Sequence, residues 1–186
     1  ALVNATAGTT VRGAFDPIRP LAELARAHGA WLHVDGAFGG SLALSSSHRR
    51  LLDGCELADS FAWDPHKMMG VPLQCSALIV ARRGALAASL DETADYLFQA
   101  DGEELNPGHR SIQCGRRNDA LKLWAAWLRL GDRGWDERLG RQLALAARAA
   151  ALVAADPELE LVEPPPSLNV CFTVRGAASE AVCDRL

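Results

Sequence analysis

The sequence predicts an α/β domain in three layers, with a mainly parallel sheet between layers of helices. The main observation is a helix signal over residues 16–29 that separates two short apolar runs, 2–5 and 31–34. A strand, a helix and a strand at this spacing form a parallel βαβ unit with a right-handed crossover. The composition, with 49% hydrophobic and 23% charged residues, is that of an ordinary globular domain. At 186 residues the chain is one domain or a piece of a larger one.

The first helix has clear start and stop signals. Asp16 is expected to cap its N-terminus, Pro17 suits its first position, and Gly29 ends it. Its apolar face consists of Leu21, Leu24 and Ala25. The sheet on which this helix packs is therefore expected to be parallel and covered.

Further apolar runs extend the sheet. Strands are expected over 60–63 and 77–80, the second following the first closely. A helix over 40–52 is expected between the second and third strands.

Beyond residue 81 the character of the sequence changes. Residues 91–109 are polar and punctuated by Gly and Pro, which predicts a long loop of the kind that carries function. Two helices, over 118–130 and 136–155, follow this loop. The first of them has a broad apolar face formed by Leu121, Leu123, Trp124, Trp127 and Leu128.

A cluster of prolines, Pro164–Pro166, marks a boundary near the end of the chain. Strands are expected on either side of it, over 159–162 and 168–174. We therefore divide the chain into residues 1–155, part of a large domain with its long helices, and residues 156–186. The second part is the start of a small α+β unit that stops just after a helix begins.

Composition narrows the class of function. A net charge of -4 gives no basic field for nucleic acid or an anionic membrane, so a small-molecule site is expected. The alanine-rich stretch 143–155 is interrupted by Arg148 and is too short to cross a bilayer.

Residues 1–10 carry no signal-peptide pattern, and the lack of an initiator Met suggests a missing N-terminal part. The five cysteines have no C-x-x-C spacing, which fits neither a disulfide framework nor a zinc site and indicates reduced thiols in the cytoplasm.

The first candidate functional residue is Asp35, at the end of the apolar run 31–34. Ligands of open parallel sheets bind beyond the carboxyl ends of the strands, which is where Asp35 falls. It is followed by Gly36, Ala37, Phe38, Gly39 and Gly40, mostly small residues that let a flat group approach the backbone. A turn acid or a helix cap is an equally good interpretation of Asp35 from position alone.

The second candidate group is the stretch WDPHKMMG over residues 63–70, which also follows a strand and so lies at the same edge. Lys67 and Lys122 are the two Lys among 19 basic residues, and a primary amine can lose its proton and attack a carbonyl as Arg cannot. Partial exclusion of water would favour the neutral amine of Lys67. The side chains expected to exclude it are Trp63, Met68 and Met69. The alternatives are a surface Lys in a loop and, for His66, an ordinary hydrogen-bonding role.

A carboxylate and an amine at the top of a parallel sheet match what pyridoxal phosphate requires, an imine from Lys and an acid partner for the pyridinium nitrogen. Five stretches resemble successive signatures of the group II pyridoxal-phosphate-dependent amino acid decarboxylases: VNATAGTTVRGAFDP, WLHVDGAFGG, ADSFAWDPHKMMGVPLQCSALIV, YLFQ and IQCGRRNDALKLW. The resemblance is nearest to the glutamate and cysteine sulfinate decarboxylases. It implies a fold type I large domain and a homodimer whose active sites lie at the subunit interface.

The resemblance implies a role for each matching position. Lys67 would carry the internal aldimine of pyridoxal phosphate, and Asp35 would pair with the pyridinium nitrogen. Ala37 would pack against one face of the ring, and Thr10 would hydrogen-bond near the ring's oxygen substituent. His66 would lie beside the aldimine.

The sequence departs from the family pattern at several positions. Asp64 stands where many relatives have an Asn in the phosphate environment, and Gly36 and Phe38 replace an Ala and a Trp or Tyr. Relatives carry a loop Tyr that protonates the substrate carbon after CO₂ leaves. That position falls near residues 103–105, which include no Tyr, and the single Tyr, Tyr96, belongs to the YLFQ stretch.

The expected reaction is decarboxylation of an acidic L-amino acid, namely glutamate, cysteine sulfinate or aspartate, with His66 as the first candidate proton donor. Relatives are much longer and supply the ring-stacking His, the phosphate cradle and the carboxylate-binding Arg from outside this segment. The 186-residue chain alone is therefore expected to be inactive. Two alternatives stay open: another fold type I enzyme, aminotransferase-like or aldehyde-forming, and a catalytically silent fragment.

Overall fold

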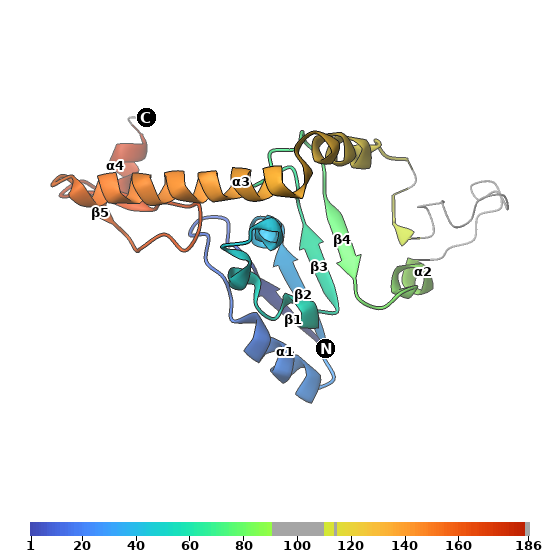
Figure 1. The fold of residues 1–186 in the computed structure, drawn as a ribbon. Helices are drawn as coiled ribbons and strands as arrows, with labels where there is room; N and C mark the ends of the chain where they lie inside the picture. The colour runs from blue at the N-terminus through green and yellow to red at the C-terminus, as the bar shows by residue number, and fades with distance from the viewer. Residues whose placement is uncertain (91–109, 114, 185–186) are drawn as a thin grey trace.

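A computed structural model describes residues 1–90, 110–113 and 115–184 (Figure 1). Its main sheet has the order β1 (Leu2–Thr6), β2 (Trp31–Gly36), β3 (Ser60–Trp63) and β4 (Ala77–Val80). The first three strands are parallel, and β4 runs antiparallel to β3 because their short connection has no crossover helix. The α/β class and the mainly parallel sheet are confirmed.

Helix α1 (Ile18–Ala27) connects β1 to β2 as predicted, but its start differs. The Asp16 carboxylate accepts the Thr6 N–H at 2.7 Å, and the Asp16 N–H donates to the Thr6 carbonyl at 2.9 Å. The capping role predicted for Asp16 is therefore wrong, because that side chain ties the loop to β1. The predicted apolar face is also partly wrong, since Leu24 is 52% exposed. The buried residues of the helix are Ile18, Ala22 and Ala25.

The α-helix predicted over 40–52 is wrong. The structure has three short 3₁₀ segments there, η1 (Gly39–Leu44), η2 (Arg49–Leu52) and η3 (Cys55–Leu57). Ser45 is extended and ends η1, and its hydroxyl lies 3.3 Å from the His48 ring, a local interaction that competes with helix formation.

The two long helices are confirmed as a pair, merged as α3 (Asp119–Ala155) with a break at Gly131. Gly131 has φ 64° and ψ 179°, which takes it out of the helical region and bends the chain, as Figure 1 shows. The second helix thus begins just after Gly131 rather than at residue 136. Helix α2 (Ala85–Leu90), after β4, was not predicted.

The C-terminal strands form a separate antiparallel pair, β5 (Leu159–Leu161) and β6 (Phe172–Val174), followed by α4 (Ser179–Cys183). Strand β6 is shorter than the predicted 168–174. Asn169 binds the backbone of Thr10 and Val11 near the end of β1, which keeps this part of the segment out of the ladder.

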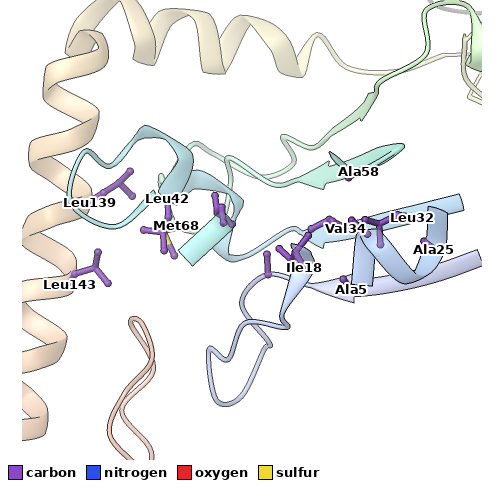
Figure 2. Packing of buried hydrophobic residues seen from close by; sticks show 13 residues of the cluster. Ala5, Ile18, Ala25, Leu32, Val34, Leu42, Ala58, Met68, Leu139 and Leu143 are labelled. Carbon is purple, nitrogen blue, oxygen red and sulfur yellow. The ribbon is translucent and has the colours of Figure 1, made fainter. Parts of the chain in front are cut away.

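The core lies on one face of the main sheet. The connections from β1 to β2 and from β2 to β3 step in the same direction along the sheet. Because both crossovers have the same hand, α1 and the 3₁₀ segments lie on the same face of the sheet. Leu139 and Leu143 of α3 join the same cluster (Figure 2). A second cluster consists of Met69, Val71, Cys75 and Trp135. The described residues thus supply the sheet and one of the expected helical layers.

None of the helices in the described parts of the chain is long and apolar enough to span a membrane.

Candidate active site

The candidate residues gather at one edge of the sheet, where β1, β2 and β3 all end. The loops that leave this edge are joined directly, since the Ala7 N–H donates to the Asp35 carbonyl at 2.8 Å and the Gly39 N–H donates to the Ala7 carbonyl at 2.9 Å. Parallel register pairs Asp35 with Thr6 on one side and Ala62 on the other. The segments that carry Thr10, Asp35 and Lys67 therefore leave neighbouring strands at a common edge, as the sequence predicted.

Asp35 is a half-buried residue of β2 itself, not of the loop beyond it. Its Oδ1 accepts the Ala37 N–H at 3.0 Å, so the residue does act as a turn acid. The other carboxylate oxygen makes no hydrogen bond within the described residues. The turn role and a ligand role are thus compatible, because they use different oxygens.

The backbone behind Asp35 is closely packed against β3. A Cβ on Gly36 would lie 2.3 Å from the Phe61 ring, and one on Gly40 would lie 2.8 Å from it. This gives a structural reason for Gly36: Phe61 occupies the space that a methyl group would need.

Lys67 lies in a tight turn after β3. Its N–H donates to the Asp64 carbonyl at 2.9 Å, and its Nζ is 3.0 Å from Asp64 Oδ2. The Lys67 side chain is 41% exposed. Met68 and Met69 are each buried in a different apolar cluster, so they anchor the turn. The Lys67 amine itself contacts the Asp64 carboxylate, instead of the apolar side chains expected to exclude water from it.

His66 is oriented by the backbone of Cys75. The ring Nδ1 lies 2.8 Å from the Cys75 carbonyl oxygen and 3.2 Å from the Cys75 nitrogen. The His66 Nε2 then faces Asp64, 3.9 Å from Oδ2. Asp64 is therefore the common neighbour of His66 and Lys67.

Cys75 is a positioning contact that sequence reasoning did not find. It acts through backbone atoms, so its side chain gives no signal of the role. Burial raises the pKa of the Cys75 thiol, partly opposed by the charge of Lys122. A thiol that stays protonated is a poor nucleophile, so we assign Cys75 no chemical step.

Thr10 lies in the loop between β1 and α1. The loop is closed by the Gly8 and Thr9 N–H groups, which donate to the Ala14 carbonyl at 3.0 and 2.9 Å. Thr10 is exposed, and its carbonyl accepts a hydrogen bond from the Asn169 side chain at 2.9 Å. Among the residues predicted from the sequence, His66 and Lys67 thus lie close to the same Asp64 carboxylate. Thr10, Asp35 and Ala37 lie at the same edge of the sheet, on or after the neighbouring strands β1 and β2.

A half-buried carboxylate and an accessible primary amine at the carboxyl edge of a mainly parallel sheet define the class: an α/β protein with a site suited to a carbonyl-bearing cofactor. The chain belongs to the pyridoxal-dependent decarboxylase family. Residues 1–175 match the family described as the pyridoxal-dependent decarboxylase conserved domain. Both the family predicted from the motifs and its pyridoxal dependence are confirmed.

Individual relatives agree with this assignment. Cysteine sulfinic acid decarboxylase of Homo sapiens is 46% identical over 175 residues, which cover 92% of this chain and 36% of that protein. The crystal structure of mouse CSAD matches with a TM-score of 0.86 at 40% identity, covering 99% of this chain and 38% of that one. The Oryza sativa TDC structure with PLP and tryptamine matches with a TM-score of 0.87 at 34% identity, covering 99% and 39%. The chain thus spans little more than a third of the length of these relatives.

Proposed function

We propose that the whole protein removes the α-carboxylate of an acidic L-amino acid in a pyridoxal-phosphate-dependent reaction that gives an amine and CO₂. The observation that carries this proposal is the placement of Asp35 near the end of β2 and of Lys67 in the turn that follows the neighbouring strand β3, at one sheet edge. The high identity to cysteine sulfinic acid decarboxylase favours an acidic substrate, either cysteine sulfinate itself, glutamate or aspartate.

The residues present suit pyridoxal phosphate. Lys67 offers an amine that is 41% exposed and able to condense with an aldehyde, and Asp35 offers a carboxylate oxygen not used in its own turn. Ala37, whose N–H binds Asp35 Oδ1, has a small side chain that would pack against a flat ring. When bound, the cofactor supplies an electron sink for the bond that breaks at the substrate's α-carbon.

The protein's own residues would then divide the work. Lys67 would hold the cofactor covalently, Asp35 would hold a proton on the ring nitrogen, and Thr10 would hydrogen-bond to a ring oxygen substituent. Asp64 would orient Lys67 through the 3.0 Å contact with its Nζ. We place no role in phosphate binding on Asp64, because a carboxylate repels a phosphate.

His66 is the candidate proton donor. Its Nδ1 is held against the Cys75 backbone, so Nε2 is the atom that would hold and deliver a proton toward the substrate carbon. The Asp64 carboxylate lies on the same side of the ring, with Oδ2 3.9 Å from Nε2.

The test is a measurement of CO₂ and amine from cysteine sulfinate, glutamate and aspartate by the full-length protein. Borohydride reduction followed by peptide mapping should place a pyridoxyl group on Lys67, and Lys67→Ala should abolish both the label and turnover. Lys122→Ala is the matched control, since Lys122 also pairs with an Asp three residues earlier, at 2.7 Å. A label on Lys122 instead, or turnover by Lys67→Ala, would refute the assignment.

A second candidate function is an aldehyde-forming reaction of the same site. It is favoured by the lack of a Tyr near residues 103–105, although that part of the chain lies outside the described residues. Product analysis separates the two functions: amine as sole product supports the decarboxylase, and aldehyde supports the second candidate. If His66 is the donor, His66→Gln should increase the share of aldehyde while CO₂ release continues.

We also propose that the whole protein is a homodimer with the active sites at the subunit interface, as the family resemblance implies. Sedimentation of the full-length protein tests this, and a monomer that retains full turnover would contradict it.

A further inference from the structure

The loop that carries Thr10 is held by a distant part of the chain, residues 163–171. The Asn169 amide donates to the carbonyls of Thr10 and Val11, both at 2.9 Å. The buried Ser167 hydroxyl donates to the Gly13 carbonyl at 3.1 Å. Arg12, which lies between Val11 and Gly13, forms a bidentate ion pair with the Glu163 carboxylate.

These contacts join residues that are 151 to 159 positions apart in the sequence. Carbonyl oxygens only accept, so the Asn169 amide nitrogen must be the atom that faces Thr10 and Val11. One side chain thereby fixes two successive peptide groups of the loop, which restricts the orientation of Thr10 more than a single bond could.

The packing at Gly13 shows how closely the two segments meet. A Cβ at Gly13 would lie 2.5 Å from the Ser167 hydroxyl and 2.7 Å from Asn169 Oδ1, and Gly13 has φ +65°. Both the space and the backbone conformation thus require glycine. The Asn169 Oδ1 is buried and has no hydrogen-bond partner within the described residues, so the contacts of this side chain to the loop are made by its amide nitrogen alone.

We propose that Asn169 is a positioning residue for the cofactor site: it fixes the loop that holds Thr10, and so couples the segment after the proline cluster to cofactor binding. The proposal rests on the proposed function, in which Thr10 contacts pyridoxal phosphate. Asn169 itself touches the Thr10 and Val11 backbone and acts through the loop. Ser167 supports the same loop through its hydrogen bond to the Gly13 carbonyl.

The experiment uses the full-length protein and two independent readouts. The first is hydrogen exchange of the backbone amides of residues 8–13, which reports on the loop with no cofactor present. The second is the dissociation constant of pyridoxal phosphate. Loss of two neutral hydrogen bonds in Asn169→Ala should speed the exchange and weaken cofactor affinity by about tenfold. Asn169→Asp keeps the side-chain size but removes the donor, so it should behave as Asn169→Ala does.

A double-mutant cycle with Thr10→Val tests whether Asn169 acts through Thr10. If it does, Asn169→Ala should lower the affinity in the parent protein but have little further effect in the Thr10→Val background. A merely structural role would reduce affinity equally in both backgrounds. Asn118→Ala is the matched control, since Asn118 precedes α3, is exposed and makes no side-chain capping bond, so both readouts should stay at the parent values. Ser167→Ala, which removes one bond, provides a milder variant if the Asn169 variants fail to fold.

Unchanged exchange in Asn169→Ala would overturn the proposal, and so would faster exchange with unchanged cofactor affinity. Equal losses of affinity in the two backgrounds of the cycle would overturn it as well. These outcomes differ from failure of the proposed function, which would appear as absence of the pyridoxyl label on Lys67 in the parent protein.

Discussion

At the scale of single residues, the site depends on side chains held by short local contacts. Asp35 uses one carboxylate oxygen in its own turn, His66 is fixed by the Cys75 backbone, and Asp64 sits between His66 and Lys67. In Asp35 and in His66, the contact leaves a second polar atom of the side chain outside it, which is why one residue can serve both the fold and the chemistry.

Asp35→Asn separates these two uses. The amide keeps an oxygen that can accept the Ala37 N–H, so the protein should fold normally. A neutral amide cannot hold a proton on a ring nitrogen by charge, so kcat/KM should fall by an amount equivalent to about 3 kcal/mol of transition-state stabilisation. Asp16→Asn is the control, because Asp16 also accepts a backbone N–H near this edge, and its turnover should stay near the parent value. Parent-like turnover by a folded Asp35→Asn protein would exclude the role.

Cys55 gives a prediction about pH. Burial, followed by the charges of Glu56 and Asp53, raises the pKa of its thiol to about 12. The thiolate is the form that reacts with iodoacetamide, so at pH 8 alkylation of Cys55 should be much slower than that of the exposed Cys183. The Cys55 rate should continue to rise by about tenfold per pH unit from pH 8 to 10, because the thiol stays far below its pKa there. Equal rates for the two cysteines at pH 8 would contradict this assignment.

At the scale of secondary-structure elements, α3 links the two clusters of the core. Leu139 and Leu143 pack with the sheet cluster, and Trp135, which is 1% exposed, packs with Met69 and Val71. Met68 and Met69 come directly after Lys67, so the packing of this helix also fixes the turn that carries the amine. The Met68 carbonyl accepts a hydrogen bond from Gln142 of the same helix at 3.2 Å.

Two Leu→Ala substitutions on α3 should separate packing from helix propensity. Leu139 is 1% exposed and Leu145 is 57% exposed, and both lie in the same helix. Leu139→Ala should lower the free energy of unfolding by about 3 kcal/mol through lost burial and a residual cavity. Leu145→Ala should change it by less than about 0.5 kcal/mol. Urea denaturation of both variants gives the comparison, and similar losses would show that packing of α3 on the sheet is not what stabilises it.

At the scale of the whole molecule, the described residues leave apolar surface uncovered. Helices pack on one face of the sheet, while Leu2 and Leu78 of its edge strands are 66% and 52% exposed. Trp124 and Leu128 of the first half of α3 are 59% and 68% exposed. This surface belongs to a chain that spans 36% of the length of human cysteine sulfinic acid decarboxylase.

The 186-residue chain, expressed by itself, should therefore self-associate and should not release CO₂. Exposed strand edges and exposed apolar side chains favour association between copies of the chain. Sedimentation at several protein concentrations should show mass that rises with concentration, and the apolar dye ANS should bind. A stable monomer of 19.9 kDa at all concentrations would show that the exposed surface is not adhesive. Detectable decarboxylation by the chain would show that the part of the relatives' length that it does not span is not essential.

Several elements could be predicted from the sequence because their signals are local. The apolar runs of β1, β2 and β3 and the helix between the first two depend on residue periodicity and on Pro and Gly signals. Predictions that assumed a local role for a side chain were wrong when a distant group used that side chain. Asp16, for example, binds β1 instead of capping α1. The prediction for Leu24 was wrong for another reason, since this side chain remains exposed.

The sequence by itself determined the α/β class, the family, and the placement of Asp35 and Lys67 at the carboxyl edge of neighbouring parallel strands. These follow from patterns within short segments and from the rule that parallel strands end at one edge. The tertiary structure alone decided which atoms meet: the Cys75 backbone on the His66 imidazole, and Asn169 on the Thr10 loop. Contacts of this kind join backbone groups or residues far apart in the chain. Backbone groups are the same in every residue, and therefore no residue pattern in the sequence records their partners.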